Sequence, residues 1–216
     1  RRFVRRDTAL VGRQLELASL VGRLEHAVAG SGSVVEVVGD AGIGKSRLIR
    51  EVATTAEREG VAVFSTYCAS HAAGMAFQAA AELLRDMFGI SEVDGDVARQ
   101  RVRAQLSGAN EVDLALVEDL LGIREPTVAA PVLDPDASRR RITATISNFA
   151  LSRSTPGVYL IEDVHWIDPV SEAILADLVA DLRQTGALVL VTARPHYRGA
   201  LEPPIAADRI VLAPLD

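Results

Sequence analysis

Apolar residues along the chain occur either in short continuous runs or at helical spacing. Continuous runs rich in valine, leucine and isoleucine are typical of strands that are buried on both faces of a parallel sheet. Such runs predict five strands, at residues 34–38, 61–67, 157–161, 187–192 and 209–212. The segments between them mostly show helical spacing, which favours an α/β fold with a parallel sheet flanked by helices.

Apolar positions three and four residues apart predict the helices. The first should end near Gly30 and the second near Gly60, while residues 74–122 read as a helical insertion without a catalytic cluster. After a proline-containing loop, Asp136 is expected to cap a further helix. Asp168 followed by proline predicts the start of the last helix.

The segment at residues 39–46 reads Gly-Asp-Ala-Gly-Ile-Gly-Lys-Ser and matches the phosphate-binding pattern Gly-x4-Gly-Lys-Ser/Thr. Its glycines permit positive φ and let backbone N–H groups approach phosphate oxygens, and a helix N-terminus follows. Lys45 supplies a charge for the β and γ phosphates, and Ser46 a hydroxyl for Mg²⁺. An ordinary glycine turn is the alternative, but the flanking apolar strand and amphipathic helix favour nucleotide binding.

Two acids, Glu162 and Asp163, directly follow the third predicted strand. Mg²⁺ prefers hard oxygen ligands, and phosphoryl transfer to water needs a group that polarises the water, so these acids predict a metal and catalytic site. Strand-end solvation or a helix cap would be the structural alternatives. Thr192 and Arg194 lie where the fourth predicted strand ends, so they are expected at the same edge of the sheet. Thr192 would then lie near the attacking water, and Arg194 near the γ-phosphate.

Some side chains near these motifs have no single interpretation. His165 and Trp166 follow the acids, where packing or strand-end hydrogen bonding competes with a contact to the γ-phosphate region. The three arginines at 139–141 point in different directions on a helix, so a solvated helix start competes with a phosphate or partner contact.

The composition and charge of the chain argue against a membrane protein, a secreted protein and a protein with a basic surface for nucleic acid. The chain has 216 residues, a net charge of -6 and 49% hydrophobic residues, as expected for one soluble domain without a basic field for nucleic acid. No apolar run is long enough for a membrane span, and the start does not resemble a secretion signal. The single cysteine, Cys68, fits a reducing compartment, so we expect a cytoplasmic protein. Residues 1–10 are expected to be a linker from an upstream domain of a longer polypeptide.

Four motifs together resemble a known family: residues 11–16 (Val-Gly-Arg-Gln-Leu-Glu), 39–46, 160–168 (Leu-Ile-Glu-Asp-Val-His-Trp-Ile-Asp) and 191–195 (Val-Thr-Ala-Arg-Pro). The combination resembles the STAND class of AAA-like P-loop ATPases. It looks most like the modules fused to bacterial class III adenylate cyclases and to large LuxR-type transcription regulators.

The resemblance implies a three-layer P-loop NTPase fold of the ASCE, AAA-like type, with its core at 11–216 and a truncated C-terminal lid. It implies ATP or ADP with Mg²⁺ as ligands, and Ser46 and Glu162 at the metal, although many relatives carry Asp at the latter position. Asp163, Thr192 and Arg194 would be catalytic. The implied nucleotide contacts are Val11, Arg13, Gly39, Gly42, Ile43, Gly44, Lys45, Ser46 and Arg47.

These expectations combine into one functional hypothesis: a slowly hydrolysing ATP switch that signals to a covalently attached output domain, either a cyclase or a DNA-binding domain. Direct contact with nucleic acid or a membrane is not expected, and self-association stays open. The first alternative is a non-hydrolysing scaffold or protein-interaction module. A small-molecule kinase is the second, but no stretch identifies an acceptor pocket.

Overall fold

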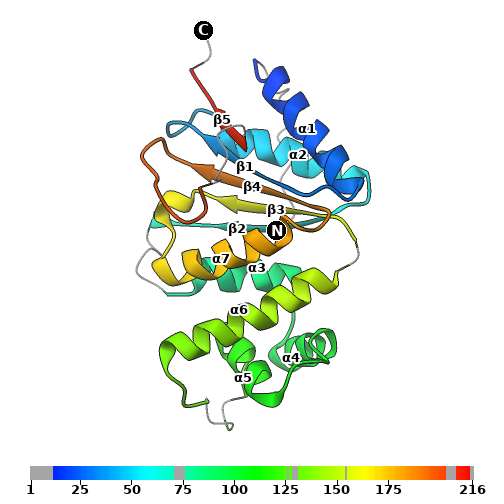
Figure 1. Ribbon diagram of the computed structural model, residues 1–216, viewed down its shortest axis with the longest axis vertical. Coiled ribbons are helices and arrows are strands. Elements are labelled where there is room, and N and C mark those ends of the chain that lie inside the picture. Colours follow the sequence, from blue (N-terminus) through cyan, green and yellow to red (C-terminus); the bar gives the residue numbers. More distant parts are fainter. Residues whose placement is uncertain are drawn as a thin grey trace.

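The computed structural model describes residues 12–70, 76–125, 127, 131–153, 155–202 and 208–214. Its centre is a parallel five-stranded sheet with the order β2-β3-β4-β1-β5 (Figure 1). This confirms the predicted parallel sheet. The strands are β1 (Ser33–Val38), β2 (Ala62–Tyr67), β3 (Gly157–Glu162), β4 (Ala187–Ala193) and β5 (Arg209–Val211).

Helices cover both faces of the sheet (Figure 1). On one face lie α1 (Gln14–Val28) and α2 (Lys45–Arg58); on the other lie α3 (Gln78–Met87) and α7 (Pro169–Leu182). Beyond α7 come α6 (Pro135–Ser152), α4 (Gly95–Gln105) and α5 (Glu111–Leu120). Of the stretch predicted as a helical insertion, α3 therefore belongs to the layer that covers the sheet. None of the described helices combines the length and apolar character that crossing a membrane requires.

Successive side chains along each strand point to opposite faces of the sheet, and they form two apolar cores, one on each side. In β4, Leu188 and Leu190 face the core beneath α1 and α2, whereas Val189 and Val191 face the core beneath α3 and α7. All four side chains are fully buried. Continuous apolar runs in the sequence therefore correspond to strands that are covered on both faces.

Parallel register brings the ends of three strands together. Val38 at the end of β1 lies opposite Ala193 of β4, and Ile161 of β3 lies opposite Val191. Residues that directly follow these strands consequently emerge at one edge of the sheet, which is where open parallel sheets bind ligands.

Two helices, α6 and α7, are capped by an aspartate that directly precedes a proline. The Asp168 side chain accepts a hydrogen bond from the Ser171 amide at 2.8 Å and caps α7, as predicted. The prediction of Asp136 as the cap of α6 is wrong: Asp134 accepts from the Ala137 amide at 3.1 Å, and Pro135 is the first residue of the helix. Proline is favoured there because the first helical N–H has no intrahelical partner.

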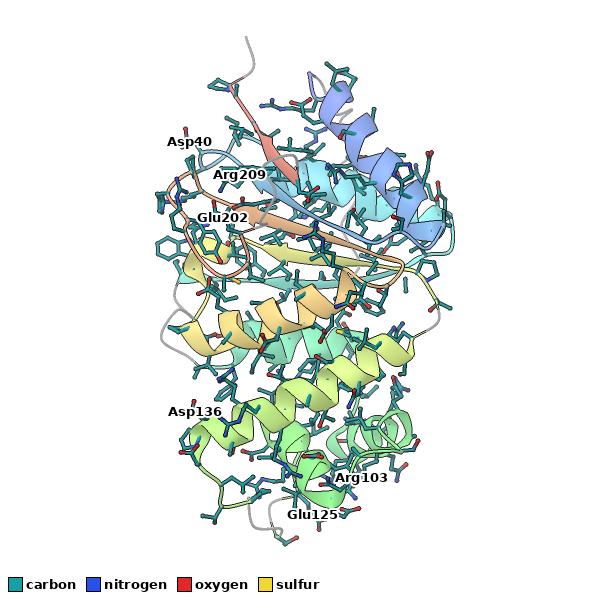
Figure 2. The ribbon with its side chains drawn as sticks, in the orientation of Figure 1. Asp40, Arg103, Glu125, Asp136, Glu202 and Arg209 are labelled. Carbon is teal, nitrogen blue, oxygen red and sulfur yellow. The ribbon has the colours of Figure 1, made fainter. Side chains whose placement is uncertain are left out.

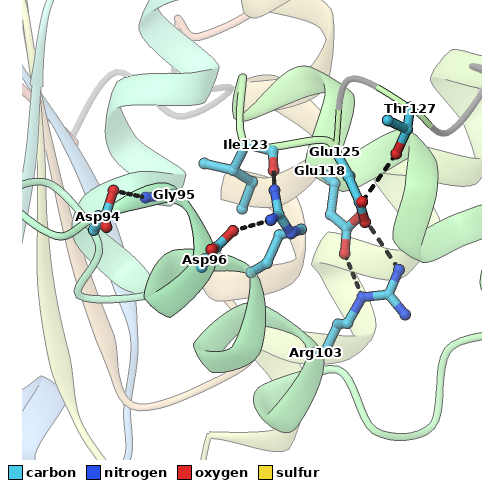
Figure 3. Close-up of polar contacts among 9 residues, drawn as sticks. Asp94, Gly95, Asp96, Arg103, Glu118, Ile123, Glu125 and Thr127 are labelled. Carbon is cyan, nitrogen blue, oxygen red and sulfur yellow. Dashed lines mark hydrogen bonds and ion pairs between the residues drawn. The ribbon is translucent and has the colours of Figure 1, made fainter.

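An outer group of three helices, α4, α5 and α6, lies at the end of the molecule opposite the loop that carries Asp40 (Figures 1 and 2). The buried Glu118 carboxylate of α5 accepts hydrogen bonds from Arg103 of α4 at 2.5 and 3.3 Å (Figure 3). This pair compensates a carboxylate that would otherwise be desolvated without a partner.

The edge strand β5 is fastened to β1 by an ion pair. Glu36 of β1 is completely buried and accepts a hydrogen bond from Arg209 Nε at 2.7 Å, while Arg209 also pairs with Glu202 at 2.8 Å (Figure 2). Burial of Glu36 without its cation would be costly, because a buried ion pair that loses one partner leaves an uncompensated charge.

Arg209→Ala should therefore lower the free energy of unfolding by about 2–3 kcal/mol in urea denaturation. Adding Glu36→Gln to this variant should recover most of the loss, because the amide removes the buried charge. Arg58→Ala, at an exposed position of α2, is the control and should change stability by no more than about 0.5 kcal/mol. An Arg209→Ala protein as stable as the control would contradict the role of the pair.

Candidate functional site

The phosphate loop, residues 39–46, connects β1 to α2 and depends on its glycines. Gly42 and Gly44 have φ angles of 78° and 103°, and Gly44 is the N-cap of α2. A Cβ atom on Gly39 would lie 2.8 Å from Cγ2 of Ile43, a half-buried side chain that packs against the core beneath α1 and α2. The loop therefore needs glycine at two positions for backbone conformation and at a third for close packing.

Lys45 is the only lysine among the 23 basic residues of the sequence, and its side chain folds back over the loop. Its Nζ atom donates to the carbonyl oxygens of Gly39 at 2.8 Å and Asp40 at 3.0 Å. Burial lowers the pKa of this ammonium group; the charge of Asp163 raises it, and that of Arg194 lowers it further. Lys45 is thus a partly desolvated cation held at the centre of the loop.

Ser46 and Glu162 lie together, as a shared metal site requires. The Ser46 side chain hydrogen-bonds to Glu162, and Arg50 approaches the same carboxylate at 3.5 Å. Burial raises the pKa of Glu162, although the hydrogen bond from Ser46 and the charge of Arg50 act in the opposite direction. Glu162 is therefore a buried acid whose ionised form is only partly compensated by the protein.

Asp163 has an unusual backbone conformation for a non-glycine residue, with φ 57° and ψ 44°. Its amide donates to Oγ1 of the fully buried Thr192 at 2.8 Å, which connects the end of β3 to β4. Its carboxylate accepts a hydrogen bond from Tyr67. Burial, followed by the charge of Asp163, raises the pKa of the Tyr67 hydroxyl, which keeps it protonated as a donor. These contacts hold the Asp163 side chain in one place.

Arg194 and His165 complete the cluster. The Arg194 guanidinium lies over the Trp166 ring, 5.5 Å from its centroid, which is a cation–π arrangement. His165 belongs to η2 (Val164–Trp166), the short 3-10 helix after Asp163, and its ring lies 5.3 Å from that of Trp166 and 6.2 Å from that of His196.

The remaining predicted nucleotide contacts are less directly connected to this cluster. Arg13 is buried and donates to Glu16 at 3.0 Å and to the carbonyl oxygen of Ala213, so it joins the start of α1 to the segment after β5. Arg47 is half-buried on the first turn of α2. Val11 lies outside the described residues.

The donor set fits a magnesium-bound polyphosphate. Ser46 and Glu162 offer two adjacent hard oxygen atoms, and Mg²⁺ typically takes one or two protein ligands together with substrate phosphates. Among the described residues there is no group of three or more acidic, histidine or cysteine side chains that could hold a metal alone. A cation here would accordingly depend on its anionic ligand.

The family model of the AAA ATPase domain matches residues 9–191. This chain belongs to the AAA ATPase domain family. Membership confirms the AAA-like P-loop ATPase expected from the sequence motifs, and it indicates nucleotide binding.

Two further likenesses were found for this AAA ATPase domain. An uncharacterized protein of Rhizobium meliloti (strain 1021) is 31% identical over 232 residues, which cover 99% of this chain and 21% of that protein. The structure of the Aeropyrum pernix ORC1 protein in complex with DNA is similar at 20% identity with a TM-score of 0.47, covering 96% of this chain and 47% of that one. The chain thus spans about a fifth and about half of the lengths of these two proteins.

Two contacts of the AAA ATPase domain site are absent from the sequence predictions. Arg50 lies one helical turn after Ser46, so helical spacing alone places it on the same face of α2 as Ser46. Tyr67 ends β2 and reaches Asp163 because β2 pairs with β3. No local pattern reveals that strand order.

Glu162→Gln should stabilise the protein at neutral pH. Because the pKa of Glu162 is raised on folding, the folded state binds more protons than the unfolded state between the unfolded value of 4.5 and the folded value, so stability falls as pH rises through that window. Removing the buried charge should add about 1 kcal/mol to the free energy of unfolding at pH 7.5, with no gain below pH 4.5.

Urea denaturation at both pH values in a chelating buffer measures this effect. Glu57→Gln, at an exposed position of the same α2 helix, is the control and should show no such pH-dependent gain. A Glu162→Gln protein that is less stable than wild type at pH 7.5 would show that the carboxylate is fully compensated by its partners.

Proposed function

We propose that this AAA ATPase domain binds Mg²⁺-ATP on the phosphate loop and hydrolyses it slowly, as the switch of a larger signalling protein. The observation that carries the proposal is the position of Lys45, bonded to the loop carbonyls and facing the charges of Asp163 and Arg194 from two neighbouring strands. A polyphosphate needs backbone donors and cations, and its hydrolysis needs a nearby carboxylate. These groups occur together at one sheet edge.

In this proposal Asp163 accepts a proton from the water that attacks the terminal phosphorus of ATP. The bond from that phosphorus to the bridging oxygen breaks, which leaves ADP and inorganic phosphate. Thr192 holds the Asp163 amide, so it orients the base. Lys45 and Arg194 stabilise negative charge on the phosphates. Mg²⁺ held by Ser46 and Glu162 would supply further charge neutralisation.

Arg194 and Thr192 support the switch part of the proposal. Thr192 lies near the end of β4 and Arg194 directly follows that strand, where it also stacks on Trp166 of η2. A terminal phosphate contacted by Arg194 would be present with ATP and absent with ADP, and such differential contacts are what a two-state switch requires. The motifs at 11–16, 160–168 and 191–195 favour the STAND class, with a cyclase or DNA-binding domain as the attached output.

A non-hydrolysing scaffold is the second candidate, and one observation favours it. The Asp163 carboxylate already accepts a hydrogen bond from Tyr67, which occupies a group that hydrolysis would use as a base. Such a protein would bind ATP without converting it.

Lys45→Ala should weaken Mg²⁺-ATP binding by about 10- to 100-fold in calorimetric titration, because it removes charge-assisted hydrogen bonds to phosphate. The matched control is Arg58→Ala, which removes an exposed cation from the last turn of the same helix and should bind ATP as wild type does. Unchanged affinity in Lys45→Ala would count heavily against the assignment of the loop.

Asp163→Asn should bind Mg²⁺-ATP but release phosphate about 100-fold more slowly than wild type, because the amide cannot accept the proton. A phosphate-release assay under saturating ATP measures this loss. Asp177→Asn, at an exposed position of α7, is the control. Normal turnover in Asp163→Asn would move the base elsewhere, and no turnover in wild type would favour the scaffold.

A further inference from the structure

His165 has two buried ring nitrogens without a hydrogen-bond partner among the described residues. Buried polar atoms in folded proteins nearly always have a partner, so a side chain with two such atoms is an exception that needs an explanation. Strand-end hydrogen bonding, one of the roles considered for His165 from the sequence, does not account for it.

The position of His165 is fixed by its surroundings. It lies in the middle of η2, whose turn is closed by hydrogen bonds from Trp166 N to Asp163 O and from Ile167 N to Val164 O, both 3.0 Å. Val164 is fully buried and anchors this turn in the core. The backbone that carries the ring is therefore hydrogen-bonded within the turn and anchored to the core through Val164.

Three of the four charged groups around His165, namely Asp163, Lys45 and Arg194, are those proposed above to act at the terminal phosphate. Asp163 belongs to the segment that precedes η2, Lys45 comes from the phosphate loop, and Arg194 and His196 follow β4. Burial lowers the pKa of His165; Asp163 acts against this, and Arg194, Lys45 and His196 reinforce it. The ring is consequently neutral at pH 7 in the nucleotide-free protein, among cations that an incoming phosphate would neutralise.

We propose that His165 reads the terminal phosphate of ATP by donating a hydrogen bond from its ring to a γ-phosphate oxygen. This inference rests on the proposed nucleotide binding and assigns a specificity role to a residue outside the phosphate loop. ADP lacks the group that His165 contacts, so the residue contributes to the preference for triphosphate over diphosphate.

Contact between His165 and the γ-phosphate should also couple nucleotide binding to proton uptake. Phosphate charge beside the ring favours the imidazolium form, so ATP binding takes up a proton at His165 and ADP binding takes up less. Lys45 also has a lowered pKa and could contribute to proton uptake, so wild type must be compared with variants of His165 alone.

The test is calorimetric titration of the purified chain with Mg²⁺-ATP and with Mg²⁺-ADP at pH 7, in two buffers of different ionisation enthalpy. His165→Phe keeps a ring beside Trp166 but can neither donate nor titrate. We expect its ATP affinity to fall about tenfold, the scale of one hydrogen bond to a charged group, with ADP affinity unchanged. The buffer dependence specific to ATP should shrink as well.

Two further variants sharpen the result. His165→Asn restores a donor that cannot titrate, so it should recover part of the ATP preference without recovering the proton uptake. His26→Phe makes the same substitution at an exposed position on α1 and should behave as wild type.

The outcomes separate this inference from the proposed function. If wild type binds both nucleotides and Lys45→Ala binds them weakly, but His165→Phe keeps the wild-type ratio of affinities, the role of His165 is overturned alone. An equal loss of ATP and ADP affinity in His165→Phe would also overturn it, because such a loss would show that His165 supports the structure of the site and does not recognise the γ-phosphate. Binding of neither nucleotide by wild type would overturn the proposed function and this inference with it.

Discussion

The parallel pairing of β3, β4 and β1 is the constraint on which the candidate site depends. Because the three strands run in one direction with their ends aligned, the phosphate loop, Asp163 and Arg194 all emerge at the same edge. The hydrogen bond from the Asp163 amide to Thr192 Oγ1 then connects the residue after β3 to β4. A shift of one residue in either pairing would turn side chains to the opposite face and separate these groups.

Partial removal from water shifts the pKa values of three titratable side chains in the candidate site. Burial lowers the pKa of Lys45 and His165 and raises that of Glu162, so each of these groups is less favourable in its charged form than it would be in water. A polyphosphate with its cation would supply opposite charges to all three. The destabilising effect of such a site is offset elsewhere, by two apolar cores and by pairs such as Glu36 with Arg209.

Features with local signals could be predicted from the sequence, and those without could not. Apolar runs identify the five strands, and the glycine pattern identifies the phosphate loop. Both Asp134 and Asp168 precede a proline and cap a helix, so the reasoning that located the second could have located the first in place of Asp136. The contact of Tyr67 with Asp163 depends on strand order, which only the folded structure reveals. The catalytic roles themselves stay predictions.

The central claim is that Mg²⁺-ATP binds across the ends of β1, β3 and β4. Backbone hydrogen exchange with and without Mg²⁺-ATP tests it most directly, because it reports on every segment at once. Binding at this edge should slow exchange in residues 39–46, 162–166 and 192–194, with no change in α4 and α5 at the opposite end of the molecule. Protection confined to α4 and α5, or no protection at saturating ATP, would contradict it.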